Sequence, residues 1–60
     1  MFKYRVNFYS TILKQNSFFN IVAKNDKEAI KKAKELYFNC FLLNVSKYIN
    51  GNYLIIKKFN

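Results

Sequence analysis

The sequence predicts an α+β domain in which one helix packs on one face of a four-stranded sheet built from two β-hairpins, in the order β-β-α-β-β. Three features favour this class. Apolar and polar residues alternate at the start of the chain, a capped amphipathic segment occupies its middle, and an Asn-Gly pair separates two β-prone segments near its end. Sixty residues make a single domain, residues 1–60, and an apolar fraction of 52% predicts a packed core despite a net charge of +8.

The first hairpin is predicted from apolar and polar residues that alternate with a period of two. Phe2, Tyr4, Val6 and Phe8 alternate with polar neighbours, which is typical of a strand with one buried face. A turn over residues 11–16 leads to a second strand over residues 17–24. On that strand the predicted inward positions are Phe19, Ile21 and Ala23, and the outward positions are Phe18, Asn20 and Val22.

A helix is predicted to begin at Asn25. Glu28 follows three residues later, so the pair forms a capping box, and Asp26 adds negative charge where the helix dipole is positive. The inward positions of this helix are Ala29, Ile30, Ala33, Leu36 or Tyr37, and Cys40, whereas Lys27, Lys31, Lys34 and Glu35 face water.

The second hairpin is predicted from Asn50-Gly51, because both central residues of the favoured two-residue turn need a positive φ. Strands over residues 41–49 and 52–59 then pair so that Val45 lies opposite Ile56 and Tyr48 lies opposite Tyr53. One face of this hairpin would carry Leu43, Val45, Leu54 and Ile56. The other would carry Leu42, Asn44, Ser46, Tyr48, Tyr53, Ile55, Lys57 and Phe59.

Two strand orders are compatible with this element order. The layout resembles the protein G immunoglobulin-binding domain, a resemblance that implies parallel pairing of the first and last strands at the centre of the sheet. A meander is the alternative. The resemblance concerns architecture alone and implies nothing about antibody binding.

A second resemblance covers about a third of the chain. The segment from Phe19 through Ile21, Ala23 and the Asn25 cap to Ala33 resembles the strand-to-helix signature of the DpnD/PcfM-like proteins of mobile elements. It implies phage or plasmid ancestry. The composition agrees, because Phe, Tyr, Met, Ile, Asn and Lys, whose codons are A/T-rich, make up 38 of the 60 residues. Part of the lysine content is therefore expected to reflect codon usage.

The sequence offers little for catalysis, so we expect a protein that is not an enzyme and uses no cofactor. Histidine, the usual acid-base group at neutral pH, is absent. Asp26, Glu28 and Glu35 lie in or beside the helix, where capping and surface pairing account for them. Cys40 is expected to fill the core. No cluster of metal ligands or phosphate-binding glycine loop is present.

The sheet face opposite the helix is the predicted binding surface. Lysine and arginine can neutralise phosphates while tyrosine stacks on bases, so this face is predicted to bind nucleic acid. The predicted contacts are Lys3, Arg5, Tyr9, Lys24, Tyr48, Tyr53 and Lys57. The apolar residues expected on the same face, as contacts for a homodimer or a partner, are Phe18, Val22, Leu42 and Ile55. In the purely structural interpretation, the tyrosines only stabilise the sheet and the lysines only maintain solubility.

Three functions therefore stay open: binding of nucleic acid or a nucleoprotein, inhibition of a host defence nuclease in the manner of an anti-CRISPR protein, and homodimerisation. For the second, a basic surface favours a host protein with an acidic patch. No run approaches the roughly 18 apolar residues of a membrane span, and the start of the chain lacks the apolar stretch of a signal peptide, so a cytoplasmic location without membrane contact is expected.

Overall fold

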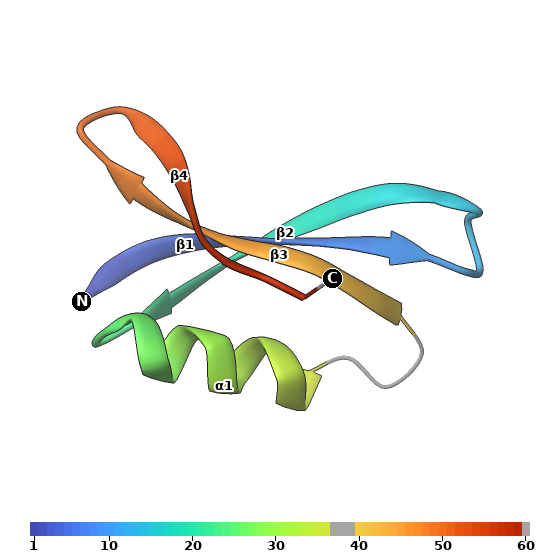
Figure 1. Ribbon diagram of the computed structural model, residues 1–60, viewed down its shortest axis with the longest axis horizontal. Helices are drawn as coiled ribbons and strands as arrows, with labels where there is room; N and C mark the ends of the chain where they lie inside the picture. The colour runs from blue at the N-terminus through green and yellow to red at the C-terminus, as the bar shows by residue number, and fades with distance from the viewer. Residues whose placement is uncertain (37–39, 60) are drawn as a thin grey trace.

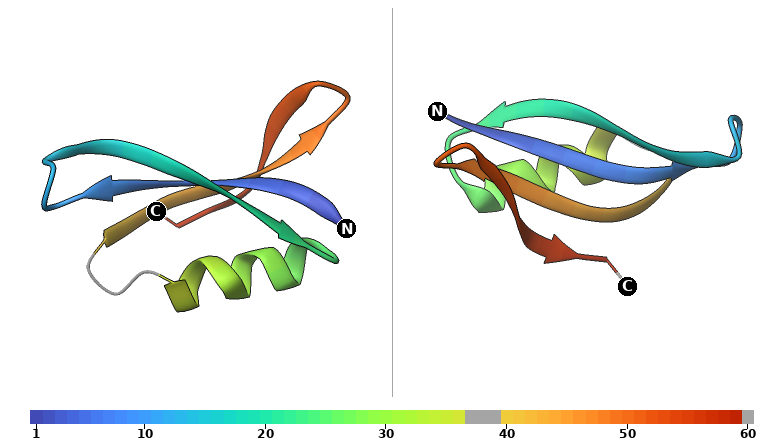
Figure 2. Two further views of the ribbon diagram at one scale, coloured as in Figure 1. Left: turned by 180° about the vertical axis from the view of Figure 1, so that it is seen from behind. Right: turned by 90° about the horizontal axis from the view of Figure 1, so that it is seen from above.

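The computed structural model describes residues 1–36 and 40–59 (Figure 1). Its elements are β1 (Phe2–Ser10), β2 (Gln15–Ala23), α1 (Asp26–Leu36), β3 (Cys40–Ile49) and β4 (Asn52–Lys58). All four strands form one antiparallel sheet, and α1 covers one of its faces (Figures 1 and 2). The predicted fold class is confirmed. Within the described residues, no helix has the length and apolar character needed to cross a bilayer.

The strand order is β2-β1-β3-β4, which differs from both orders considered from the sequence. The centre of the sheet is an antiparallel pair of β1 and β3, so neither a parallel pair of β1 and β4 nor a meander is correct. Alternation of apolar residues does not say which strand of a hairpin docks on β1. Of the two strands of the second hairpin, the ten-residue β3 carries the buried side chains. The shorter β4 ends in two lysines, which suit a solvent-facing edge.

The first hairpin follows the predicted alternation. Tyr4 pairs with Ile21 and Val6 pairs with Phe19, so the inward residues of both strands meet on the helix side. Tyr4, Val6 and Ala23 are fully buried. The loop between the strands is shorter than predicted, because β1 continues to Ser10 and β2 already begins at Gln15.

The N-terminus of α1 confirms the predicted cap. The Asn25 Oδ1 accepts a hydrogen bond from the Glu28 N–H at 2.9 Å. The Glu28 carboxylate accepts from the Lys24 N–H at 3.4 Å instead of the Asn25 N–H, and it also pairs with Lys32 at 3.3 Å. The helix is therefore secured to the end of β2 as well as to its own first turn.

The C-terminal end of the helix differs from the prediction. The helix ends at Leu36, and Cys40 is the first residue of β3, where it pairs with Ser10 of β1. Apolar periodicity extended the predicted helix into the next strand, because both elements present apolar residues toward the same core. The predicted inward positions Leu36 and Tyr37 lie outside the described side chains.

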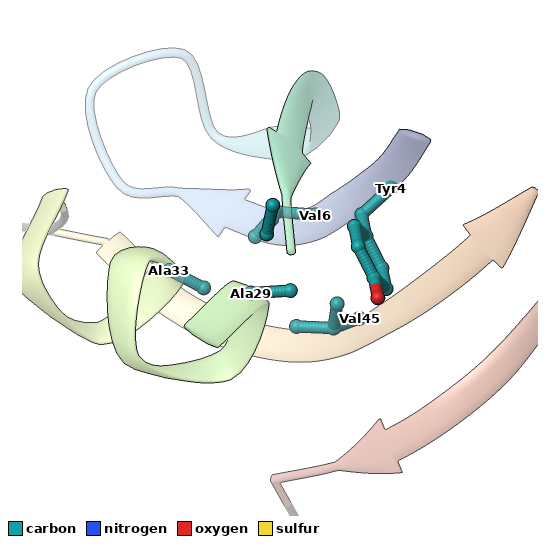
Figure 3. Close-up of a cluster of buried hydrophobic side chains, with 6 residues drawn as sticks. Tyr4, Val6, Ala29, Ala33 and Val45 are labelled. Carbon is teal, nitrogen blue, oxygen red and sulfur yellow. The ribbon is translucent and has the colours of Figure 1, made fainter. Parts of the chain in front are cut away.

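A small core lies between the helix and the two central strands (Figure 3). Ala29 and Ala33 of α1 are fully buried and lie against Val6 of β1 and Val45 of β3. Their short side chains let the helix approach the sheet closely. The partly buried residues packed around this centre are Phe19, Ile21, Leu42, Ile56 and Phe59.

One polar contact joins the core to the start of the helix. The Tyr4 hydroxyl donates a hydrogen bond to the Asp26 Oδ1 at 2.8 Å, and the Lys47 Nζ lies 3.3 Å from the same oxygen. Burial, followed by this hydrogen bond to a carboxylate, raises the pKa of Tyr4 to about 12. The hydrogen bond from Tyr4 lowers the pKa of Asp26. The contact with Lys47 lowers it further, by a smaller amount. The three side chains connect β1, α1 and β3.

The second hairpin has the predicted turn but not the predicted register throughout. Asn50 and Gly51 have φ values of 49° and 85°, and Tyr48 pairs with Tyr53 as expected. The register then shifts between Val45 and Ser46, so Val45 lies opposite Lys57 and not opposite Ile56. A second shift, between β1 and β3, follows Asn7. Each irregularity reverses the faces assigned to the residues beyond it.

Candidate functional site

The candidate site is the sheet face opposite α1, here called the open face, which none of the described elements covers (Figures 1 and 2). Strand pairing arranges its side chains in rows across the sheet. Arg5 of β1 lies between Asn20 of β2 and Ser46 of β3, and Asn7 lies between Phe18 and Asn44. On β4, Ile55 lies opposite Ser46 and Lys58 lies opposite Asn44. Tyr53 lies opposite Tyr48 in a further row.

Arg5 occupies the middle of the open face. Its guanidinium carbon lies 4.3 Å from the ring centroid of Phe18 and 4.1 Å from that of Tyr53. Ser46, the neighbour of Arg5 on β3, is only 4% exposed, and its small side chain leaves space for the arginine to extend over β3 toward β4. The guanidinium is thus held between two aromatic rings, where both ring quadrupoles attract its charge.

The aromatic cluster continues at the turn end of the second hairpin. The rings of Tyr48 and Tyr53 meet edge to face at 5.1 Å, and the Lys3 ammonium lies 5.3 Å from the centre of the Tyr48 ring. The hairpin rises away from the helix at this end (Figures 1 and 2). Two cations and three rings therefore form one contiguous cluster across β2, β1, β3 and β4.

A polar row lies next to this cluster. The Asn7 Nδ2 donates to the Asn44 Oδ1 at 2.8 Å, and the Ser46 hydroxyl donates to the same oxygen at 3.5 Å. These bonds fix both amide groups on the open face beside Arg5. The open face therefore carries polar amide groups next to its aromatic side chains.

The charges are divided between the two sides of the sheet. All three side-chain carboxylates of the chain belong to α1. Asp26 is paired with Lys47, and a salt bridge to Lys32, followed by the Lys24 N–H, lowers the pKa of Glu28. The open face has the cationic side chains of Lys3, Arg5 and Lys58 and no anionic side chain. Its potential is therefore positive, although the helix also bears several lysines.

Eight of the predicted site residues lie on the open face. Seven of them either gather around Arg5 or lie in the same row as Arg5 or Lys3: Lys3, Arg5, Phe18, Val22, Tyr48, Tyr53 and Ile55. Phe18, Val22 and Ile55 expose 54%, 52% and 52% of their surfaces, so about half of each is available for contact. Exposed apolar residues gathered on one face are a common feature of binding surfaces.

The eighth residue, Tyr9, lies on the open face but away from the aromatic cluster, and Lys24 lies beyond the end of β2. Tyr9 is half-buried, two rows from Arg5, and pairs with Asn16 and Phe41. Lys24 follows the end of β2, and its N–H bonds Glu28 of the helix cap. Neither residue joins the aromatic cluster.

Leu42 and Lys57 were assigned to the open face incorrectly. The irregularity after Asn7 places Leu42 opposite Phe8, where it packs against the core on the helix side. The irregularity at Val45 places Lys57 opposite that core residue. Phe59, assigned to the same face, also packs against the core.

Two residues take the vacated positions, and sequence reasoning missed both. Phe41, 67% exposed, pairs with Tyr9, and Lys58 pairs with Asn44. Irregular pairing of this kind often coincides with glycine, but the only glycine of the chain is in the turn at Gly51. No local signal in the sequence could therefore have located the two shifts.

The outer edge of β2 borders the open face. A shallow hollow of about 470 Å³ there is lined by Lys3, Asn20, Ile21, Val22 and Lys32. The Lys32 Nζ donates to the Val22 carbonyl at 2.9 Å, so one outward carbonyl of this edge strand already has a partner. A lysine at an edge hinders the addition of a further strand.

Comparisons with protein-family models, curated proteins and solved structures gave no match for this chain. Among the described residues, no group of three or more His, Cys, Asp or Glu side chains is placed to hold a metal ion. The candidate site is therefore defined by its own geometry: a positive, aromatic face without carboxylates.

Proposed function

We propose that the protein binds nucleic acid through the open face. The observation that carries this proposal is the contiguous cluster of Lys3, Arg5, Phe18, Tyr48 and Tyr53 on a face that has no carboxylate. Cations supply the phosphate attraction that dominates nucleic-acid affinity, and aromatic rings supply stacking on bases. The amides of Asn7 and Asn44 lie between them as hydrogen-bonding groups.

The proposal predicts a defined dependence on salt. Each phosphate neutralised on a single strand contributes about −0.7 to the slope of log K against log salt. Three cations on the open face therefore predict a slope of roughly −2. Fluorescence anisotropy of labelled single-stranded and double-stranded oligonucleotides at increasing salt measures this slope. Absence of binding at low salt, or affinity that salt does not change, would refute the proposal.

Stacking is tested at Tyr48, the ring beside Lys3. Replacement Y48A should weaken single-strand binding by about fivefold to a hundredfold, since a stacked base contributes roughly 1–3 kcal/mol. Replacement Y48F keeps the ring and should keep the affinity. Equal affinity of Y48A and the wild-type protein would show that this ring does not contact bases.

A second candidate function follows from the half-exposed apolar residues of the same face. Phe18, Val22 and Ile55 are also suited to contact a protein, either a host target that the chain inhibits or a second copy. Recovery of one stable host protein after nuclease treatment of a lysate would support the inhibitor function. The expected phage or plasmid origin agrees with that function. Light scattering that reports a dimer at tens of micromolar would support self-association.

A further inference from the structure

We infer that Arg5 is the binding site for one phosphodiester group of a single strand, and that the bases on either side of this phosphate lie over Phe18 and over the Tyr48–Tyr53 pair. This inference rests on the proposed function and specifies its ligand. It assigns Arg5 a role different from that of the lysines, which attract the polyanion without orienting it.

The first supporting observation is that the guanidinium is already held in place. Its contacts of 4.3 Å to Phe18 and 4.1 Å to Tyr53 restrict it from both sides, and buried Ser46 neighbours it on β3. A side chain that is ordered before binding loses less conformational entropy when it binds. Lys3, in contrast, has an ammonium on a flexible stem and touches a single ring, that of Tyr48.

The second observation is that this guanidinium has no anionic partner. The Arg5 Nε is buried and forms no hydrogen bond, whereas the carboxylates of Asp26 and Glu28 pair with lysines on the helix side. Among the described residues, Nε is the only buried side-chain nitrogen or oxygen without a partner. Arg5 as a whole is only partly buried, so part of its side chain remains in contact with solvent. A half-buried charge without a partner is unfavourable until an anion binds it.

The third observation concerns the shape of the site. A guanidinium presents two parallel N–H groups that match two oxygens of a phosphate. The aromatic side chains lie on opposite sides of it: Phe18 belongs to the edge strand β2, and Tyr53 belongs to β4 at the other edge. Phosphate between two bases is the repeating unit of a single strand, so the order ring, guanidinium, ring reproduces that repeat.

These positions also indicate the path of the ligand. Phe18 lies in the row of Asn7, Arg5 lies one row further along β1, and Tyr53 lies in the next row, opposite Tyr48. The bound strand would therefore cross the sheet diagonally from β2 to β4. A duplex is excluded from this mode, because its bases are paired with each other and cannot stack on protein rings.

The test uses the fact that Arg5 is the only arginine of the chain, so its Nε–H gives one arginine side-chain signal in a ¹H–¹⁵N spectrum. The wild-type protein is titrated separately with a dinucleoside monophosphate, inorganic phosphate, acetate and an uncharged nucleoside. We expect the signal to shift with the dinucleoside monophosphate at concentrations where the other three leave it unchanged. An unmoved signal would overturn the inference. An equal shift with inorganic phosphate or acetate would also overturn it, because the site would then be a simple anion site.

A matched substitution separates this inference from the proposed function. R5K keeps the charge and removes the planar fork, and it should weaken single-strand binding by about tenfold. K31R, which exchanges lysine and arginine at an exposed position of α1 away from the open face, should leave the affinity within about twofold. If R5K binds as tightly as the wild-type protein, the phosphate site is wrong while the proposed function stands. If the wild-type protein binds no oligonucleotide, the proposed function itself fails.

Discussion

Replacement of Tyr4 by phenylalanine should test the contact that joins the sheet to the helix. The substitution keeps the buried ring and removes only the hydroxyl that donates to Asp26 at 2.8 Å. A hydrogen bond to a charged group contributes roughly 1.5–3 kcal/mol, but the Asp26 side chain is 49% exposed and keeps Lys47 at 3.3 Å. Water can also reach the carboxylate, so we expect Y4F to lower the free energy of unfolding by about 1–1.5 kcal/mol at neutral pH.

The same variant makes a prediction about pH. The pKa of Tyr4 is about 12 in the folded protein, above its usual value of 10.0. A raised pKa favours the protonated form in the folded state, so this stabilisation is complete below pH 10 and is lost as the pH rises from 10 toward 12. The advantage of the wild-type protein over Y4F should therefore shrink in that window. The lowered pKa of Asp26 has the opposite sign, and its contribution is lost as the pH falls below 3.8.

Urea denaturation at pH 7, 10 and 11.5 measures these differences, with Y48F on the open face as the control. In a 60-residue domain, each 1 kcal/mol should also change the melting temperature by roughly 4–8 °C. We expect Y48F to differ from the wild-type protein by less than about 0.5 kcal/mol at pH 7. The reasoning fails if Y4F equals the wild-type protein at pH 7, or if the difference between them does not change above pH 10.

Two further substitutions test the packing and the cap of the helix. Ala33 is fully buried against the sheet, so A33L should destabilise the protein by about 1–3 kcal/mol through overpacking. A denaturation midpoint equal to that of the wild-type protein would contradict the close approach of α1 to the sheet. Asn25 accepts a hydrogen bond from the Glu28 N–H at 2.9 Å, so N25A should lower the free energy of unfolding by about 1 kcal/mol in the same assay. N25D should lower it little, because aspartate also caps helices. Equal losses in both variants would argue against a capping role.

The local elements of the fold could be predicted because each depends on near neighbours in the chain. Alternation specified the inward face of β1, Asn25 specified the helix start, and Asn50-Gly51 specified the turn. The strand order could not be predicted in this way. It depends on which strand of the second hairpin docks on β1, a contact between residues far apart in the sequence.

The candidate site was predictable up to the two shifts in register. The strand period of two places Lys3, Arg5, Tyr48 and Tyr53 on the same face, because neither shift in register lies between them. Leu42 and Lys57 lie beyond the shifts, where one extra residue exchanges the faces. The position of Arg5 between two rings also required the structure, because Phe18 and Tyr53 belong to opposite edges of the sheet.

The claim that the open face binds nucleic acid is tested most directly by removing equal charge from the two sides of the sheet. K3A/K58A removes two lysines from the open face, and K27A/K31A removes two exposed lysines from α1. Single-strand affinity of each variant is measured against salt. We predict that K3A/K58A reduces the salt slope by about 1.4 in magnitude and that K27A/K31A leaves it nearly unchanged. Equal reductions in both variants would show that net charge, and not the open face, is responsible for binding.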